Sequence, residues 1–181
     1  GADIPNSSEA VTGSLVASLS GNGAVLAIGK NNSIKLYEQA GGGWSHIEDI
    51  KLTDFNVNYD SFSLSEDGSI LGVGIRYKNT ATIYKRNGDS WTQVGSDIEG
   101  EAEGDRFGTS LAVSDDGTAV AISAPYNRGN GEYDGNSRQY GHVRIYSIDS
   151  PTQINEEGTS GNDTLTGASG DDTLAGGDGD D

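Results

Sequence analysis

The chain has no cysteine, only 3 prolines and no apolar run of membrane-spanning length among its 181 residues. The missing cysteine excludes a disulfide framework and thiol chemistry, although it leaves secretion open because bound metal can replace cross-links. The missing apolar run excludes a membrane-spanning helix. The first ten residues also lack the basic and apolar segments of a secretory signal peptide, so we expect a fragment or a processed form.

Basic residues are scarce, with 11 Lys and Arg against 28 Asp and Glu and a net charge of −17. Such a chain repels phosphate groups, which argues against nucleic acid as a partner and against insertion into anionic membranes. After residue 150 the chain carries eight acids and no base. Halophilic adaptation or solubility would account for acidity spread over the chain, but acidity concentrated in a glycine-rich tail favours cation binding.

Helical periodicity is also missing, whereas the two-residue alternation of β-strands is common. It is clearest in residues 105–126, where alternating apolar residues flank the turn Ser114-Asp115-Asp116-Gly117. The short polar side chains and the glycine of this turn suit a hairpin. The sequence therefore predicts an all-β chain with little or no helix.

The same hairpin occurs three times, with turns that begin at Ser20, Ser65 and Ser114. Each turn is followed by an apolar strand and then by a strand with a tyrosine, and Trp44 and Trp91 open a fourth strand in the first two units. Four strands in about 45 residues is the repeat of a β-propeller blade. We predict an N-terminal segment at 1–10 and an incomplete β-propeller of about three four-stranded blades. The blades are expected at 11–55, 56–105 and 106–150.

The strands within each unit have distinct patterns. The second strand is apolar on both faces, so we expect other blades to cover both of them. The third strand alternates, which predicts that Ile34 and Leu36 point inward and that Lys35 and Tyr37 point outward. Because three blades do not close an ordinary ring, we expect the remaining blades of a longer chain, or self-association, to cover the outer faces.

Asp105-Arg106-Phe107-Gly108, followed by Ser123-Ala124-Pro125, resembles the FG-GAP repeat of integrin-alpha-type β-propellers. Residues 91–100 are also typical of bacterial members of that family, and the resemblance covers about residues 10–150. Some loops between first and second strands in this family carry a DxDxDG calcium site. The corresponding turns here are too short to wrap a metal, so their acids, Asp67, Asp115 and Asp116, are interpreted as turn formers.

A long insertion at 127–141 separates the second and third strands of the last unit. In integrin-like propellers, loops at this position lie on the face that meets ligands. The resemblance therefore implies a protein or glycan ligand on this loop face, and a surface loop without a ligand is the alternative. The candidate contact residues are Arg128, Tyr133, Arg138 and Tyr140.

After a linker at 151–157, residues 158–181 divide without a gap into segments of nine, GTSGNDTLT, GASGDDTLA and the incomplete GGDGDD. They resemble the RTX, or haemolysin-type, repeat GGxGxDxUx, in which U is a large apolar residue. The resemblance implies bound Ca²⁺ and a short parallel β-roll. The candidate calcium-binding residues are Gly158, Gly161, Asp163, Gly167, Gly170, Asp172, Gly176, Gly177, Gly179 and Asp181.

The residue types of the tail suit calcium, which takes about six to eight oxygen ligands from carboxylates and carbonyls. Glycine lets a turn fold so that its carbonyls point at the ion. In the RTX family one ion lies between successive turns on the same side, which pairs Asp163 with Asp181. Without calcium we expect disorder, because the carboxylates repel one another and little apolar surface can be buried. An acidic flexible linker is the alternative.

Catalytic motifs are missing as well. His46 and His142 lie far apart, each in a predicted strand, and no HExxH, GxSxG or Walker-type loop occurs. We therefore expect a non-catalytic extracellular calcium-binding module of a large secreted or surface bacterial repeat protein, active in adhesion or in protein or glycan interaction. The alternative is the accessory propeller and RTX region of a secreted RTX-type hydrolase whose catalytic domain lies outside this chain. The RTX resemblance also implies type I secretion.

Overall fold

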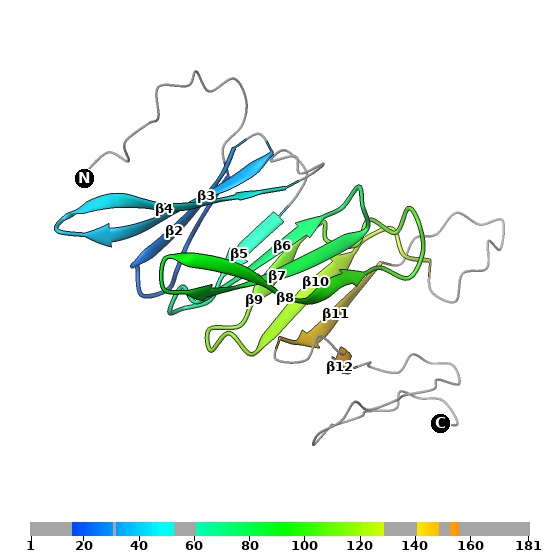
Figure 1. The fold of residues 1–181 in the computed structure, drawn as a ribbon. Helices are drawn as coiled ribbons and strands as arrows, with labels where there is room; N and C mark the ends of the chain where they lie inside the picture. The colour runs from blue at the N-terminus through cyan, green and yellow to red at the C-terminus, as the bar shows by residue number, and fades with distance from the viewer. Residues whose placement is uncertain (1–15, 31, 53–60, 129–140, 149–152, 156–181) are drawn as a thin grey trace.

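A computed structural model describes residues 16–30, 32–52, 61–128, 141–148 and 153–155. Within these ranges the chain forms strands and no helix. The strands make three antiparallel sheets of four strands each, which lie side by side in chain order (Figure 1). The predicted all-β fold is therefore confirmed. The three sheets do not close into a ring.

Each sheet is built from four strands that are consecutive in the sequence. The first sheet contains β1 (Val16–Leu19), β2 (Val25–Lys30), β3 (Ser33–Ala40) and β4 (Gly43–Lys51). The second contains β5 (Ser61–Leu64), β6 (Ile70–Ile75), β7 (Thr80–Asn87) and β8 (Ser90–Glu99). The third contains β9 (Leu111–Val113), β10 (Ala119–Ala124), β11 (His142–Ser147) and β12 (Gln153–Asn155).

The position of β12 corrects one expectation. Residues 151–157 were expected to form a linker, but residues 153–155 pair with β11 as the fourth strand of the third sheet. The segment is short, and no tryptophan marks its start as in the first two sheets. Its strand character therefore comes from pairing with β11 rather than from a local pattern.

The turn between the first and second strand is the same in all three sheets. In the second sheet the Ser65 hydroxyl donates to Asp67 Oδ1 at 2.7 Å and accepts from the Ile70 N–H at 3.1 Å. The Asp67 carboxylate also accepts from the Ser69 N–H at 2.9 Å. The same bonds recur at Ser20 with Asn22 and at Ser114 with Asp116. These side chains satisfy backbone donors within their own turns.

The turns also join one sheet to the next. The N–H of Asn22 in the first sheet donates to the Glu66 carbonyl in the second at 2.9 Å. The N–H of Glu66 donates in turn to the Asp115 carbonyl in the third sheet at 3.0 Å. The three turns therefore form a ladder of backbone hydrogen bonds that runs across the stack in one direction.

Two apolar clusters hold the stack together, one between the first and second sheets and one between the second and third. The second sheet is covered on both sides, and all six residues of β6 are buried. Trp91 lies in the first cluster and Phe107 in the second, so both rings pack between sheets. Burial of apolar area at these two interfaces is the main favourable term in the stability of the stack.

Tyr37 departs from the exposure expected on the outward face of β3. Ile34 and Leu36 are fully buried as predicted, but Tyr37 is buried too, although it was expected to point outward. The two-residue period of β3 is unbroken, because β3 pairs with β2 without a shift, and the register shift beside Tyr37 places the extra residue, Ile47, in β4. The ring of Tyr37 then meets His46 edge-on, with 5.5 Å between the ring centroids.

Glycine at position 74 sets the spacing between the second and third sheets. A Cβ on Gly74 would lie 2.2 Å from the carbonyl oxygen of Gly108, whereas a Cβ on Gly43 would meet nothing within 4 Å. We predict that Gly74→Ala lowers the free energy of unfolding by about 1–3 kcal/mol through overpacking. Gly43→Ala is the matched control and should change it by less than about 0.5 kcal/mol. Urea titration followed by tryptophan fluorescence measures both, and equal midpoints would contradict the close approach of the two backbones.

Candidate functional site

The sequence indicates two functional regions, the calcium-binding tail and the loop at 127–141. The tail residues 158–181, with every candidate calcium ligand, lie outside the described residues. So do Tyr133, Arg138 and Tyr140 of the loop. Arg128 is described and exposed, at the start of the loop. The described residues therefore include the base of the loop and, beside it, the surface formed by the β6–β7 and β8–β9 connections.

The two ends of the 127–141 loop are tied together at a buried asparagine. The N–H of Gly141 donates to the Asn127 carbonyl at 3.1 Å. The Asn127 side chain is buried, and its Nδ2 donates to Glu101 Oε2 and to Asp105 Oδ2, both at 2.7 Å. The two hydrogen bonds from Asn127 Nδ2 thus fix the base of the loop to the β8–β9 connection.

Glu101 is the charged centre of this base. It accepts from Arg144 of β11 as well as from Asn127, and His142 lies 4.0 Å away as an ion-pair partner. Partial burial acts to raise the pKa of Glu101, but the hydrogen bond from Asn127 and the charge of Arg144 outweigh it. The pKa is therefore held below its ordinary value of 4.5.

The contacts of the Asp105–Gly108 segment explain why these residue types occur there. Asp105 is buried and accepts from the Ala102 N–H at 3.2 Å as well as from Asn127. Arg106 has a φ of 56° and places its guanidinium 4.0 Å over the ring of Tyr126. Phe107 is buried between the sheets. The segment therefore directs Phe107 into the core and Arg106 toward the surface.

Asn79 links this segment to the β6–β7 connection. It has a φ of 59°, a backbone conformation that asparagine tolerates better than most residues. Its Oδ1 accepts from the Phe107 N–H at 2.9 Å, and its carbonyl accepts from the Gly100 N–H at 2.8 Å. Sequence reasoning did not single out Asn79, Glu101 or Arg144. The signal available at Asn79 was an asparagine directly before a strand, where left-handed turns are common.

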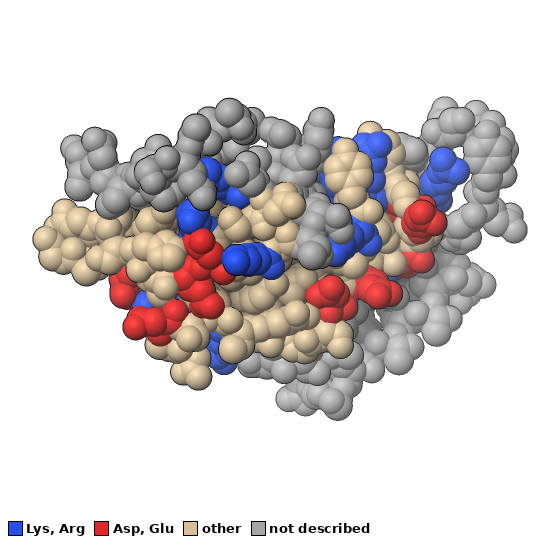
Figure 2. Space-filling model, turned by 45° about the horizontal axis from the view of Figure 1, so that its top comes forward, with Lys and Arg blue, Asp and Glu red and all other residues tan. Residues whose placement is uncertain are grey.

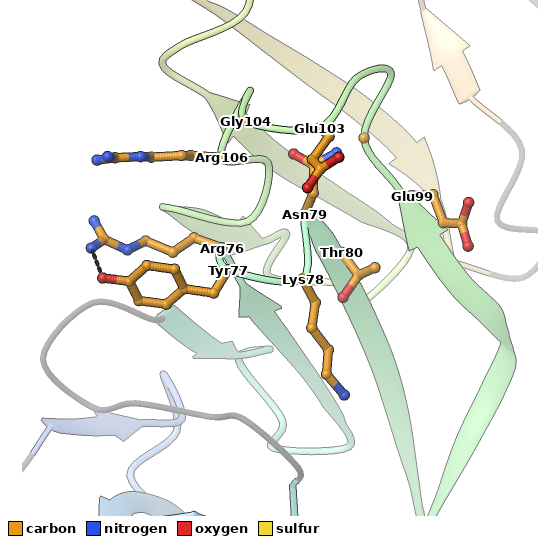
Figure 3. A pocket seen from close by; sticks show the side chains of 10 residues that line it. Arg76, Tyr77, Lys78, Asn79, Thr80, Glu99, Glu103, Gly104 and Arg106 are labelled. Atoms are coloured by element: carbon orange, nitrogen blue, oxygen red, sulfur yellow. Dashed lines mark hydrogen bonds between the residues drawn. The ribbon is translucent and has the colours of Figure 1, made fainter.

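A cleft of about 570 Å³ opens between these connections (Figure 3). One wall comes from residues 76–80 at the β6–β7 connection, and the other from residues 99–106 at the end of β8 and beyond it. Three of its lining residues are basic, namely Arg76, Lys78 and Arg106. The side chains of Arg76 and Arg106 extend in the same direction in Figure 3.

The cleft also contains acids and an exposed ring. Glu99 and Glu103 lie on the wall that β8 and its connection form, and Tyr77 is 62% exposed. Arg76 Nη2 donates to the Tyr77 hydroxyl at 2.8 Å, and its guanidinium carbon lies 4.6 Å from the ring centroid. Basic and acidic side chains are interspersed on the face that Figure 2 shows, so the grouping of cations in the cleft is local.

Across the described ranges, no group of three or more His, Cys, Asp or Glu residues is arranged to hold a metal ion. The same part of the chain contains no helix that could cross a membrane.

Glu101 gives the loop base a predictable pH dependence. Because the folded pKa is lowered, its carboxylate stabilises the fold above pH 4.5, and this contribution is lost as the pH falls through the lowered pKa. Glu101→Gln should lower the melting temperature at pH 7 and flatten its fall in acid. The cost should stay below about 1 kcal/mol because the side chain is partly exposed. Glu103→Gln makes the same charge change at an exposed neighbour. Identical pH profiles for the two variants would rule out a stabilising role for the Glu101 pairs.

Residues 157–181 match the family model of the RTX calcium-binding nonapeptide repeat, which contains four copies of the repeat. These repeats bind calcium, and Ca²⁺ is the cofactor that this segment takes. Comparison with curated protein sequences gives no match. The resemblance of residues 10–150 to FG-GAP repeats stays a prediction.

Solved structures that resemble the described fold are propeller-like. The chain is similar to hydrazine synthase of Kuenenia stuttgartiensis, with a TM-score of 0.51 and 16% identity over 76% of this chain and 35% of that chain. It is similar to a putative 6-phosphogluconolactonase of Bacteroides fragilis, with a TM-score of 0.50 and 16% identity over 78% and 37%. It is also similar to a structure described as the complex of KlAtg21 with the coiled-coil of AgAtg16, with a TM-score of 0.57 and 12% identity over 79% and 42%. The chain thus spans 35–42% of the length of these structures, and the likeness concerns the fold alone.

Proposed function

We propose that this chain is a non-catalytic, extracellular calcium-binding module of a large secreted or surface bacterial repeat protein. The observation that carries the proposal is the RTX calcium-binding repeat at 157–181. RTX repeats are typical of secreted bacterial proteins. Their carboxylates would bind calcium outside the cell, where the ion is abundant. The tail then orders on calcium binding, because the ion neutralises carboxylates that otherwise repel one another.

The proposed role of the three sheets is to form part of a β-propeller that presents a ligand-binding face. The β6–β7 connection, the Asp105–Gly108 segment and the base of the 127–141 loop contact one another and so contribute to one face. Loops held at the ends of rigid strands are suited to recognition. This supports a role in adhesion or in protein or glycan interaction.

Propeller closure by further sheets is supported by residues that occupy equivalent positions in the three sheets. Leu36 and Ile83 pair with the central positions of β2 and β6, and Ile145 pairs with the same position of β10. Leu36 and Ile83 are at most 1% exposed because the next sheet covers them, whereas Ile145 is 40% exposed. Val143, two residues before Ile145, is 65% exposed. The outer face of the third sheet therefore has the residue types of an interface with another sheet.

Calcium titration tests the tail. The full chain should release or absorb heat on calcium addition with a dissociation constant of about 10⁻⁴–10⁻³ M, as in extracellular modules, and a chain ending at residue 157 should not. Asp163→Asn should reduce binding more than Asp172→Asn, because Asp163 has a partner two repeats later in Asp181. Isothermal titration calorimetry measures these differences, and equal heats for the long and short chains would refute calcium binding by the tail.

The outer face of the third sheet is tested by self-association of the chain. We expect the sedimentation coefficient to rise with concentration, because an uncovered apolar face finds a second copy when no further sheet is present. Val143→Lys with Ile145→Lys should abolish the rise. Thr92→Lys with Gln93→Lys adds the same charge at exposed positions of β8 and should leave the rise unchanged. A chain that stays monomeric at all concentrations would argue against an interface on this face.

A further inference from the structure

We propose that the cleft between the β6–β7 connection and the β8–β9 connection binds an acidic carbohydrate, a sugar ring that carries a carboxylate. This deepens the interaction role proposed above and rests on it. It concerns the cleft residues and not the calcium-binding tail, so the two can fail separately.

The carboxylate would be bound by Arg76 and Arg106. A guanidinium presents its N–H donors in a planar fork that matches a carboxylate. Stacking on a tyrosine uses the face of a guanidinium, so the N–H donors in its plane can point toward a ligand. The guanidinium of Arg106 lies 4.0 Å over Tyr126 in this way. Arg76 is held instead by the Tyr77 side chain, to whose hydroxyl it donates from Nη2 at 2.8 Å. The two tyrosines thus hold the arginines in place. The pair is a local positive site in a chain whose net charge is −17.

The sugar ring would pack on Tyr77, whose ring is exposed beside Arg76 (Figure 3). A tyrosine ring offers an apolar face to the C–H groups of a pyranose and a hydroxyl to its polar edge. Thr80 is part of the same wall as Tyr77. Its side chain lines the cleft between Asn79 and Glu99, and its backbone follows the Asn79 turn that joins the two walls.

The acids of the cleft select against densely charged ligands. Glu99 and Glu103 lie on the wall that also carries Arg106. They repel a polyphosphate, but they accept hydrogen bonds from sugar hydroxyls. A ligand with a single carboxylate and several hydroxyls therefore matches the cleft, because its acid can meet the arginines while its hydroxyls face the glutamates.

Hydrogen bonds join the two walls of the cleft in the absence of a ligand. Asn79 holds both walls through its bonds to the Phe107 and Gly100 N–H groups. A Cβ on Gly100 would lie 2.3 Å from Asn79 Nδ2, so the walls already touch at this point. A preformed site loses little conformational entropy on binding, which favours affinity from few contacts.

The test is calorimetric titration of the full chain with trigalacturonate, with calcium chelated so that the acidic tail cannot bridge the sugar through the ion. Maltotriose is the neutral control and a triglutamate peptide the acidic control without sugar rings. Trigalacturonate should bind and the other two should not. Arg76→Gln and Arg106→Gln should each weaken binding about tenfold, the effect of one lost charge-assisted hydrogen bond.

Lys51→Gln and Lys85→Gln are the charge-matched controls. Both lysines are exposed and neither lines the cleft, so their variants should bind as the unchanged chain does. Near-ultraviolet circular dichroism confirms that each variant is folded. The proposal is overturned if trigalacturonate does not bind, if maltotriose or triglutamate binds as well, or if the arginine variants bind as tightly as the lysine variants.

Discussion

The close approach of one sheet's backbone to the next is the constraint on which the rest of the structure depends. Gly74 meets the Gly108 carbonyl with no room for a side chain, and Gly68 and Gly117 let the turns of one sheet settle on Val25 and Ile70 of the sheet before it. At this distance the turns can exchange backbone hydrogen bonds and the apolar side chains of facing sheets can interlock. The same approach places the β6–β7 connection beside the Asp105–Gly108 segment. The cleft is therefore a product of sheet stacking, although none of the stacking glycines lines it.

Much of the fold could be predicted because its signals are local. The Ser65 turn and its two equivalents repeat a serine, an acid or asparagine and a glycine at fixed positions, and the first two side chains bond within their own turn. The strands between them are either apolar on both faces, as β6 is, or alternate in polarity, as half-buried strands do. What escaped prediction depends on contacts between segments. The burial of Tyr37 involves the ring of His46 on the neighbouring strand, and β12 requires an available edge of β11.

The two candidate sites differ in the same way. The tail could be identified from the sequence because calcium ligands recur every nine residues, so that the spacing itself carries the chemistry. The cleft could not, because Arg76 and Arg106 lie in different units and meet only after the sheets have stacked. Asn79 was passed over for a similar reason. Its side chain acts on Phe107, which belongs to the next unit of the sequence.

The one-way ladder of hydrogen bonds between turns gives the stack a polarity. Each turn donates its N–H to the sheet that follows, so the leading and trailing faces of the stack are different surfaces. A twofold axis, which joins identical surfaces, cannot reproduce this contact; only head-to-tail addition can. Such addition closes when the rotation between successive sheets divides a full circle, and otherwise continues as a filament. The angle between neighbouring sheets thus determines whether the repeat builds a finite particle or an endless one.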